Sequence, residues 1–177
     1  TQRIEKLSHT DPLTGLPNRS LLGERIERAL ALAQREGAPF ALLLLNLDHF
    51  KHINDTLGHA FGDRVLVEVA ERLTAGVRQI DTVARLGADE FVLLAQRSDA
   101  AGAEAAARRV MEALQRPFTL DGMSFTVTAS LGIALHPADG SDMDGLLGRA
   151  DAAMREVKQA GRAGFRFHTQ RSQAGDA

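Results

Sequence analysis

The sequence contains no cysteine among its 177 residues. Disulfide bonds and thiolate metal sites are therefore excluded, and the absence suits a reducing compartment. The net charge is only -2 at pH 7, so the chain has no global attraction for nucleic acid or membrane surfaces. Its longest apolar run, residues 38–45, is too short to cross a bilayer, and the polar start TQRIEKLS is not a secretory signal. We therefore expect a soluble cytoplasmic segment that contacts neither nucleic acid nor membrane.

Hydrophobic residues make up 44% of the chain and charged residues 25%, which is the balance of a folded domain with a sizeable core. The spacing of apolar residues predicts both helices and strands. The expected helices span residues 20–36, 49–57, 99–115 and 142–160, with a further helix that is capped by Asp63 and carries Val65 to Leu73. The expected strands are residues 40–47, two segments around Gly87, residues 126–135 and a closing FRF. This order predicts an α/β (α+β) fold with one central mixed β-sheet flanked by helices.

Two adjacent acids stand in RLGADEF, residues 85–91, between apolar runs that predict the strands of a β-hairpin. The buried strand at 40–47 runs into a helix near His49 to Lys51, where free backbone N–H groups favour an anion. If the hairpin lies beside that strand end, Asp89 and Glu90 meet phosphate-binding amides, which is the layout of a metal-assisted nucleotide site. The alternative is that both acids are solvated turn residues.

Six motifs follow one another along the chain. They are DPLTGLPNR at 11–19, LNLDHFKHINDTLGHAFGD at 45–63, RQID at 78–81, RLGADEF at 85–91, SLGIA at 130–134 and ADAAMREVKQAGR at 150–162. In their order and length they resemble the GGDEF family of diguanylate cyclase domains, here with a degenerate GADEF signature. The resemblance implies a palm-like nucleotide cyclase/polymerase fold and the joining of two GTP molecules into cyclic di-GMP with Mg²⁺ or Mn²⁺.

The resemblance also implies which residues bind the nucleotide. Guanine, which offers both donors and acceptors, would be held by Asn54 and Asp63. The phosphates would be held by the backbone near Phe50 and Lys51 and by the side chains of Lys51, Lys158 and Arg162. Lys158 and Arg162 have an alternative explanation as ordinary charges in the last turn of a helix.

A metal site and two catalytic acids are implied in the same way. The divalent ion would be bound by Asn46, by the backbone carbonyl of Leu47, by Asp89 and by Glu90. Asp89 and Glu90 would be the catalytic residues, and Asp89 would bind metal or help to deprotonate the attacking 3′-hydroxyl.

Two positions depart from the family's pattern at the centre of this site. Asn46 stands where the first acid of a DxD motif is the principal metal ligand, so one formal charge is missing beside a dication, a deficit worth several kcal/mol. Ala88 replaces the second glycine of the signature, and if its turn requires φ > 0 the methyl costs about 1–2 kcal/mol. Arg155 and Ala163 also differ, where tyrosine and asparagine are usual. We therefore expect a catalytically degenerate regulatory module that binds GTP, cyclic di-GMP or both, with weakened Mg²⁺ or Mn²⁺ binding. The alternative is an active diguanylate cyclase that works as a homodimer.

The motif RQID matches the RxxD inhibitory site of the resembled family, where an arginine and an aspartate grip cyclic di-GMP. Arg78 and Asp81 are the candidate residues, together with Arg109 or Arg108 from the following helix. The alternative is a surface ion pair worth at most about 1 kcal/mol.

We expect the domain over residues 11–168, between an entering linker or helix end at 1–10 and an exit linker at 169–177. The polar character of both ends predicts a module of a larger protein, with an upstream sensory domain and a downstream EAL-type phosphodiesterase domain.

One further hypothesis concerns a transition metal. Four side chains near the short helix have a spacing that could line one helical face, namely Asp48, His52, Asp55 and His59. Gly58 interrupts that helix, which disfavours the hypothesis.

Overall fold

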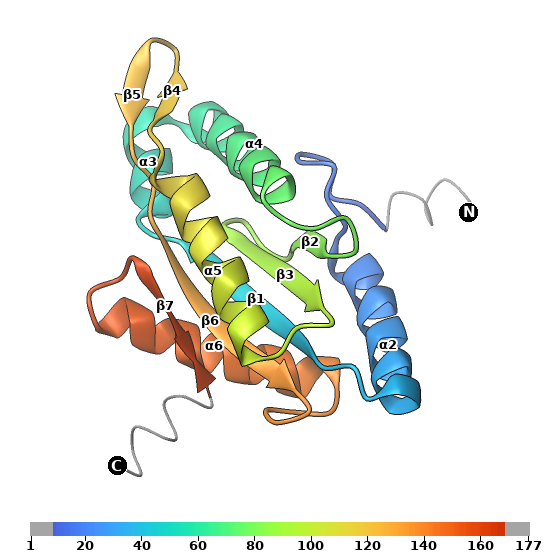
Figure 1. Ribbon diagram of the computed structural model, residues 1–177. Coiled ribbons are helices and arrows are strands. Elements are labelled where there is room, and N and C mark those ends of the chain that lie inside the picture. Colours follow the sequence, from blue (N-terminus) through green and yellow to red (C-terminus); the bar gives the residue numbers. More distant parts are fainter. Residues whose placement is uncertain (1–8, 169–177) are drawn as a thin grey trace.

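The computed structural model describes residues 9–168, so the linkers expected at 1–10 and 169–177 lie almost wholly outside the described residues. Its centre is a five-stranded sheet in the order β2-β3-β1-β6-β7, with helices on both faces (Figure 1). The helices are α2 (Arg19–Glu36), α3 (Phe50–Leu57), α4 (His59–Ala75), α5 (Ala100–Gln115) and α6 (Met143–Gln159). The strands are β1 (Phe40–Leu47), β2 (Thr82–Arg85), β3 (Glu90–Gln96), β4 (Phe118–Leu120), β5 (Met123–Phe125), β6 (Ala129–His136) and β7 (Gly164–Phe167). The predicted α/β fold with a central mixed sheet is confirmed.

Strand β1 is the middle of the sheet, paired antiparallel with β3 on one side and β6 on the other. Its residues are apolar without alternation because both of its faces are covered. Leu43, Leu45 and Leu47 pack with the buried residues of α4 and α5. Leu42 and Leu44 pack on the opposite face with those of α2 and α6. The sheet is therefore the middle of three layers, and consecutive residues of β1 face different helices.

Most element boundaries follow from capping residues that the sequence contains. Asn18, Asp99 and Asp142 each accept a hydrogen bond from a backbone N–H three residues later, at 3.1, 2.9 and 2.8 Å. These bonds satisfy donors that the first helical turn leaves unpaired, and so they fix the starts of α2, α5 and α6. The closing FRF strand is also confirmed, since β7 pairs parallel with β6 at the sheet edge after the α6 crossover.

Two expectations of local structure are wrong. Asp63 does not cap α4, because Gly58 has a φ of 92° and allows α4 to begin at the very next residue. Asp63 consequently lies in the second turn of that helix. The strand expected over 126–135 begins only at Ala129, and a separate β4–β5 hairpin precedes it. This hairpin projects beyond the sheet near α3 and α4 (Figure 1), and its strands of three residues are too short for a pattern to reveal.

Candidate functional site

The carboxyl end of β1 brings the candidate metal-binding residues together. Asn46 pairs directly with Glu90 of β3 and, on its other side, with Ser130 of β6. The backbone N–H of Leu47 donates to the carbonyl of Asp89 at 3.1 Å. Alternate residues of a strand share a face, so Asn46 lies on the same face of β1 as Leu42 and Leu44. Asn46 therefore faces the layer of α2 and α6. The hairpin acids therefore do lie beside the end of the buried strand.

Arg85 holds the tip of the signature hairpin. Its Nε donates to the carbonyl of Gly87 at 3.1 Å, and its Nη2 donates to the carbonyl of Ala88 at 3.0 Å. Its Nη1 contacts both carboxylate oxygens of Asp11, in the loop before α2, at 3.0 Å. Burial raises the pKa of Asp11, but hydrogen bonds from Thr14 and Arg85 and the Arg85 charge outweigh it and bring the pKa below its ordinary value. A side chain and a distant loop thus fix the turn.

Ala88 is not strained in this turn. The left-handed non-glycine residues within 9–168 are His49, Arg97, Asp121, Arg162 and Ala163, so neither Ala88 nor Gly87 needs a positive φ. The condition under which the Ala88 methyl would cost backbone energy is therefore not met, and that part of the expected defect is wrong. Ala88 is also exposed, so its methyl is not buried against the fold.

Glu90 lies in an acidic and partly buried environment. Burial raises its pKa above the ordinary value of 4.5, as do the charges of Asp89 and of Asp151 on α6. The charge of Arg155, also on α6, acts in the opposite direction. Burial and nearby negative charges destabilise the ionised carboxylate of Glu90, and a nearby cation would stabilise it. The environment therefore suits either a metal ion or a basic side chain.

Each carboxylate oxygen of Asp48 accepts two hydrogen bonds. Its Oδ1 accepts from Ser130 Oγ at 2.8 Å and from Lys158 Nζ at 2.9 Å. Its Oδ2 accepts from Thr128 Oγ1 at 2.8 Å and from the Ala163 N–H at 3.1 Å. Burial raises the pKa of Asp48, but the hydrogen bonds and the Lys158 charge outweigh it and leave the pKa below its ordinary value. Asp48 therefore ties β1 and β6 to α6 and the turn before β7.

The hydrogen bonds of Asp48 position the two side chains that we expect to bind phosphate, Lys158 and Arg162. Lys158 is held at the end of β1 by Asp48, with its side chain 25% exposed. Arg162 is exposed, in a turn where both it and Ala163 are left-handed, at φ of 68° and 54°. Lys158 is thus an ion-pair partner in the fold that still has ammonium donors left for a ligand.

The start of α3 offers backbone donors beside the same strand end. His49 is left-handed, with a φ of 61°, and the first helical hydrogen bond runs from the Ile53 N–H to the His49 carbonyl. The N–H groups of Phe50, Lys51 and His52 consequently precede the hydrogen-bonded ladder, as expected for an anion-binding helix start. The Lys51 side chain is exposed there.

Asn54 and Asp63 are brought together by a close contact between α3 and α4. A Cβ atom on Gly62 would fall 1.8 Å from Asn54 Oδ1, so a larger residue at this crossing would displace the Asn54 side chain. Asn54 Oδ1 is buried and has no hydrogen-bond partner. The exposed Asp63 follows Gly62 and lines a cavity of about 260 Å³ together with Leu13 and Leu120. A buried acceptor without a donor is costly, which makes Asn54 a candidate for ligand binding.

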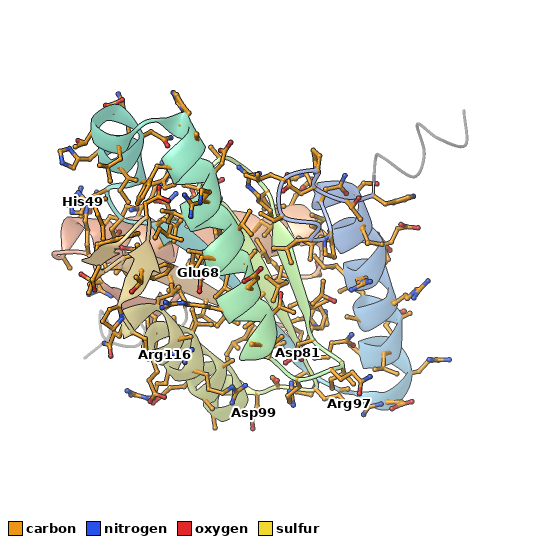
Figure 2. The ribbon with its side chains drawn as sticks, turned by 90° about the horizontal axis from the view of Figure 1, so that it is seen from above. His49, Glu68, Asp81, Arg97, Asp99 and Arg116 are labelled. Carbon is orange, nitrogen blue, oxygen red and sulfur yellow. The ribbon has the colours of Figure 1, made fainter. Side chains whose placement is uncertain are left out.

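The residues RQID lie at the opposite end of the sheet. Thr82 pairs with Leu94 and Leu94 with Leu42, so Asp81 is near the start of β1, roughly 20 Å from Asn46. In the view from above, His49 at the start of α3 and Asp81 are widely separated (Figure 2). The two candidate ligand sites are therefore distinct.

Arg78 and Asp81 are already engaged with the fold. Arg78 contacts both carboxylate oxygens of Asp81 at 3.1 Å and also donates to Gln96 O and Ser98 Oγ. The Asp81 side chain is fully buried and also accepts from the Gln96 N–H at 3.1 Å. The pair is more than a surface ion pair, because it fastens the loop after α4 to the end of β3. Arg78 is nevertheless 46% exposed and can still meet a ligand.

Of the two arginines considered on α5, Arg109 lies next to this loop. Its Nε donates to the carbonyl of Gly76 at 3.2 Å, and it lines a cavity of about 430 Å³. Arg108 instead pairs with Glu104 and lies over the Phe165 ring at 5.4 Å.

Other binding chemistry finds less support in the described part of the chain. Within residues 9–168, no group of three or more His, Asp or Glu side chains is placed to hold a metal ion, which includes the set proposed around His52 and His59. A divalent ion at the end of β1 would therefore rely on the Asn46 amide and the Leu47 carbonyl beside the two acids. None of the helices in this range is long and apolar enough to span a membrane.

Sequence reasoning missed two features of the site. The Arg85–Asp11 contact joins two motifs that are 74 residues apart, and the presence of both motifs was the available signal. The charges of Asp151 and Arg155 act on Glu90, although α6 is distant from the hairpin in sequence. No local sequence pattern reveals this effect of charge, since it arises from the way in which α6 packs on the sheet.

Comparison with known proteins identifies the family. The model of the family described as "Diguanylate cyclase, GGDEF domain" matches residues 8–164. The bifunctional diguanylate cyclase/cyclic di-GMP phosphodiesterase MucR of Pseudomonas aeruginosa is 45% identical over 94% of this chain and 24% of its own length. The chain spans only about a quarter of such relatives.

Solved structures agree with this match. The GGDEF domain of TpbB from Pseudomonas aeruginosa superimposes with a TM-score of 0.87 at 40% identity, covering 90% of this chain and 94% of the other. The GGDEF domain of DgcB from Caulobacter crescentus, solved in complex with c-di-GMP, has a TM-score of 0.80 at 30% identity, covering 90% of this chain and 93% of the other. The chain belongs to the GGDEF family of diguanylate cyclase domains.

Proposed function

We propose that this GGDEF domain of cyclic di-GMP signalling is a regulatory module that binds GTP and converts it slowly or not at all. The observation that carries the proposal is the pairing of Asn46 with Glu90 at the end of β1. At the position where the family has an acid, Glu90 faces an amide, so a metal ion there meets one formal charge fewer. This deficit acts at the step that needs metal most, the alignment and neutralisation of phosphates.

The residues that would contact guanine and phosphate support retained binding. The buried and unpaired Oδ1 of Asn54 gains a donor if the N–H groups of guanine bind there, with Asp63 as a second acceptor. The N–H groups at the start of α3, with Lys51, Lys158 and Arg162, supply donors for the phosphates. None of these residues depends on Asn46.

The residues present fit a weakly held Mg²⁺ or Mn²⁺ ion. Oxygen atoms from Asn46, the Leu47 carbonyl, Asp89 and Glu90 would hold it, and oxygen is the ligand these ions prefer. The ion, when bound, would neutralise phosphate charge. Asp89 would accept a proton from the attacking hydroxyl, and Arg85 keeps that acid in place through the hairpin tip.

Residual cyclase activity is the second candidate, and one observation favours it. Ala88 costs no backbone strain, so the hairpin presents both acids at the end of β1 despite the altered signature. Among the residues that would bind the metal ion, Asn46 is then the position that departs from the family's pattern. Synthesis would require a homodimer in which each subunit presents one GTP.

We further propose that cyclic di-GMP binds at Arg78 and Arg109, because both guanidinium groups border the loop after α4. Asp81 would act mainly by orienting Arg78, since its oxygens are occupied within the fold. The chain would belong to a larger cytoplasmic protein with a sensory domain and an EAL-type phosphodiesterase domain. The similarity to MucR, a bifunctional diguanylate cyclase/cyclic di-GMP phosphodiesterase, supports this arrangement.

Titration calorimetry with the 177-residue chain tests the proposal. We expect GTP to bind in the presence of Mg²⁺ with at least tenfold preference over ATP, in line with lost hydrogen bonds to the base. Chromatography of the same samples should show little cyclic di-GMP. Absence of GTP binding at millimolar nucleotide and metal would contradict the proposal.

A further inference from the structure

Three charged side chains follow one face of α6 beside the end of β1. They are Asp151, Arg155 and Lys158, and their separations of four and three residues place them in one stripe along the helix. Lys158 fixes where this stripe lies, because its Nζ is 2.9 Å from Asp48 Oδ1, immediately after β1.

A second point at which α6 is held against the sheet is its close approach to β6. A Cβ atom on Gly132 would fall 1.8 Å from the carbonyl oxygen of Ala150 and 2.5 Å from the backbone nitrogen of Met154. Gly132 in turn pairs with Leu44 of β1. The turn of α6 from Ala150 to Met154 therefore passes over the level of Leu44.

Asn46 lies between these two fixed points. It follows Leu44 by two residues on the same face of β1 and precedes Asp48 by two. The helical segment between the two contacts contains Arg155, so Arg155 is level with Asn46 and with the Glu90 that pairs with it. Asn46, which stands where the family has an acid, thus lies beside Arg155, which stands where the family has a tyrosine.

The guanidinium of Arg155 is available to a ligand. Its side chain is 72% exposed, and within residues 9–168 its ion-pair partner is Asp151, whose Oδ2 lies 2.9 Å from Arg155 Nε. An exposed pair of this kind contributes little, at most about 1 kcal/mol, so a phosphate can compete for the guanidinium. Guanidinium has a planar set of donors that matches two phosphate oxygens at once. The effect of the Arg155 charge on Glu90 agrees with this location.

We propose that Arg155 binds the polyphosphate of GTP and supplies part of the positive charge that a divalent ion supplies in a site with an acid at position 46. The inference rests on the proposed GTP binding and deepens it, because it makes nucleotide binding in this chain less dependent on metal. Asp151 holds the guanidinium near the end of β1 until the nucleotide enters. The alternative is that Arg155 forms a helix surface pair with Asp151 and does nothing else.

The test measures GTP affinity by titration calorimetry, once with excess Mg²⁺ and once with excess EDTA. Three chains are compared: the parent, Arg155→Ala and Arg149→Ala. Arg149 is a matched control, since it is an exposed arginine on the same helix that donates to the Gly145 carbonyl at 3.1 Å. It lies six residues before Arg155 and is outside the stripe.

We expect the parent to bind GTP in EDTA, and Arg155→Ala to weaken that binding about tenfold or more, the effect of losing one charge-assisted hydrogen bond. Arg149→Ala should match the parent, and the loss caused by Arg155→Ala should be smaller for GMP, which carries one phosphate. Equal affinities of Arg155→Ala and Arg149→Ala in EDTA would overturn the role of Arg155 alone, as would a parent that binds only with Mg²⁺. A parent that binds GTP in neither condition would overturn the proposed function as well.

Discussion

Arg85 and Asp11, which are 74 residues apart in the sequence, form an ion pair with Nη1 of Arg85 at 3.0 Å from both carboxylate oxygens of Asp11. The same guanidinium holds the carbonyls of Gly87 and Ala88 at the hairpin tip. Both partners are largely buried, with side chains 14% and 16% exposed. The geometry of the signature turn is therefore set by a side chain and a distant loop.

The first prediction is that Arg85→Met destabilises the domain by about 2–4 kcal/mol. The substitution leaves the Asp11 carboxylate without its cation and two carbonyls without their donor. Urea unfolding measures the change. The control is Arg19→Met, which removes an exposed pair with Asp144 and should cost at most about 1 kcal/mol. Equal losses in the two variants would show that the Arg85 contact is not structural.

A second prediction concerns the degenerate position of the signature. Because Ala88 has no positive φ, Ala88→Gly relieves no strain and adds freedom to the unfolded chain. We expect the free energy of unfolding to stay the same or to fall by about 0.4–1 kcal/mol. A stability gain of about 1–2 kcal/mol would instead indicate a strained turn.

The third prediction addresses the crossing of α3 and α4. Gly62→Ala would force a methyl into Asn54 Oδ1, so it should lower stability by about 1–3 kcal/mol and weaken GTP binding. Gly148→Ala is the control, since apart from its chain neighbours and the backbone of its own helix no atom lies within 4 Å of the added methyl, and the stability of the domain should rise by up to about 1 kcal/mol. Calorimetric melting and GTP titration test both variants. Unchanged GTP affinity in a folded Gly62→Ala chain would argue against a guanine site at Asn54.

The sequence predicted the secondary-structure elements more completely than it predicted the geometry of the site. The buried strand at 40–47 and the helices that begin near residues 99 and 142 depend on local patterns, so they could be predicted. The first helix was expected from residue 20, and its cap Asn18 was not recognised. The start of α4 could not, because it depends on the backbone angle of Gly58. The sequence motifs identified Asn46 and Glu90 as candidate site residues. That the two residues pair directly could be known only from the register of β1 and β3 in the structure.

A fourth prediction follows from the raised pKa of Glu90. Since the pKa in the folded chain exceeds the ordinary value of 4.5, the ionised carboxylate is less stable in the folded than in the unfolded state. Native Glu90 therefore lowers stability increasingly as the pH rises from 4.5 through its folded pKa. Glu90→Gln should raise the melting temperature near pH 7, and the gain should shrink toward zero below pH 4.5.

The control for this pH dependence is Glu27→Gln, an exposed acid on α2. Its melting temperature should follow that of the parent across the same pH range. A Glu90→Gln chain that is no more stable than the parent at pH 7 would contradict the acidic, partly buried environment described for Glu90.

The most direct test of the account is the rate at which Asn46→Asp makes cyclic di-GMP. The parent and the variant should each be fused at the N-terminus to a dimeric coiled coil and assayed with GTP and Mg²⁺, with product measured by chromatography. Restoring one negative charge beside the metal should raise the rate at least tenfold, while both chains bind GTP. A parent that already makes cyclic di-GMP as fast as Asn46→Asp would contradict the claim that Asn46 limits conversion.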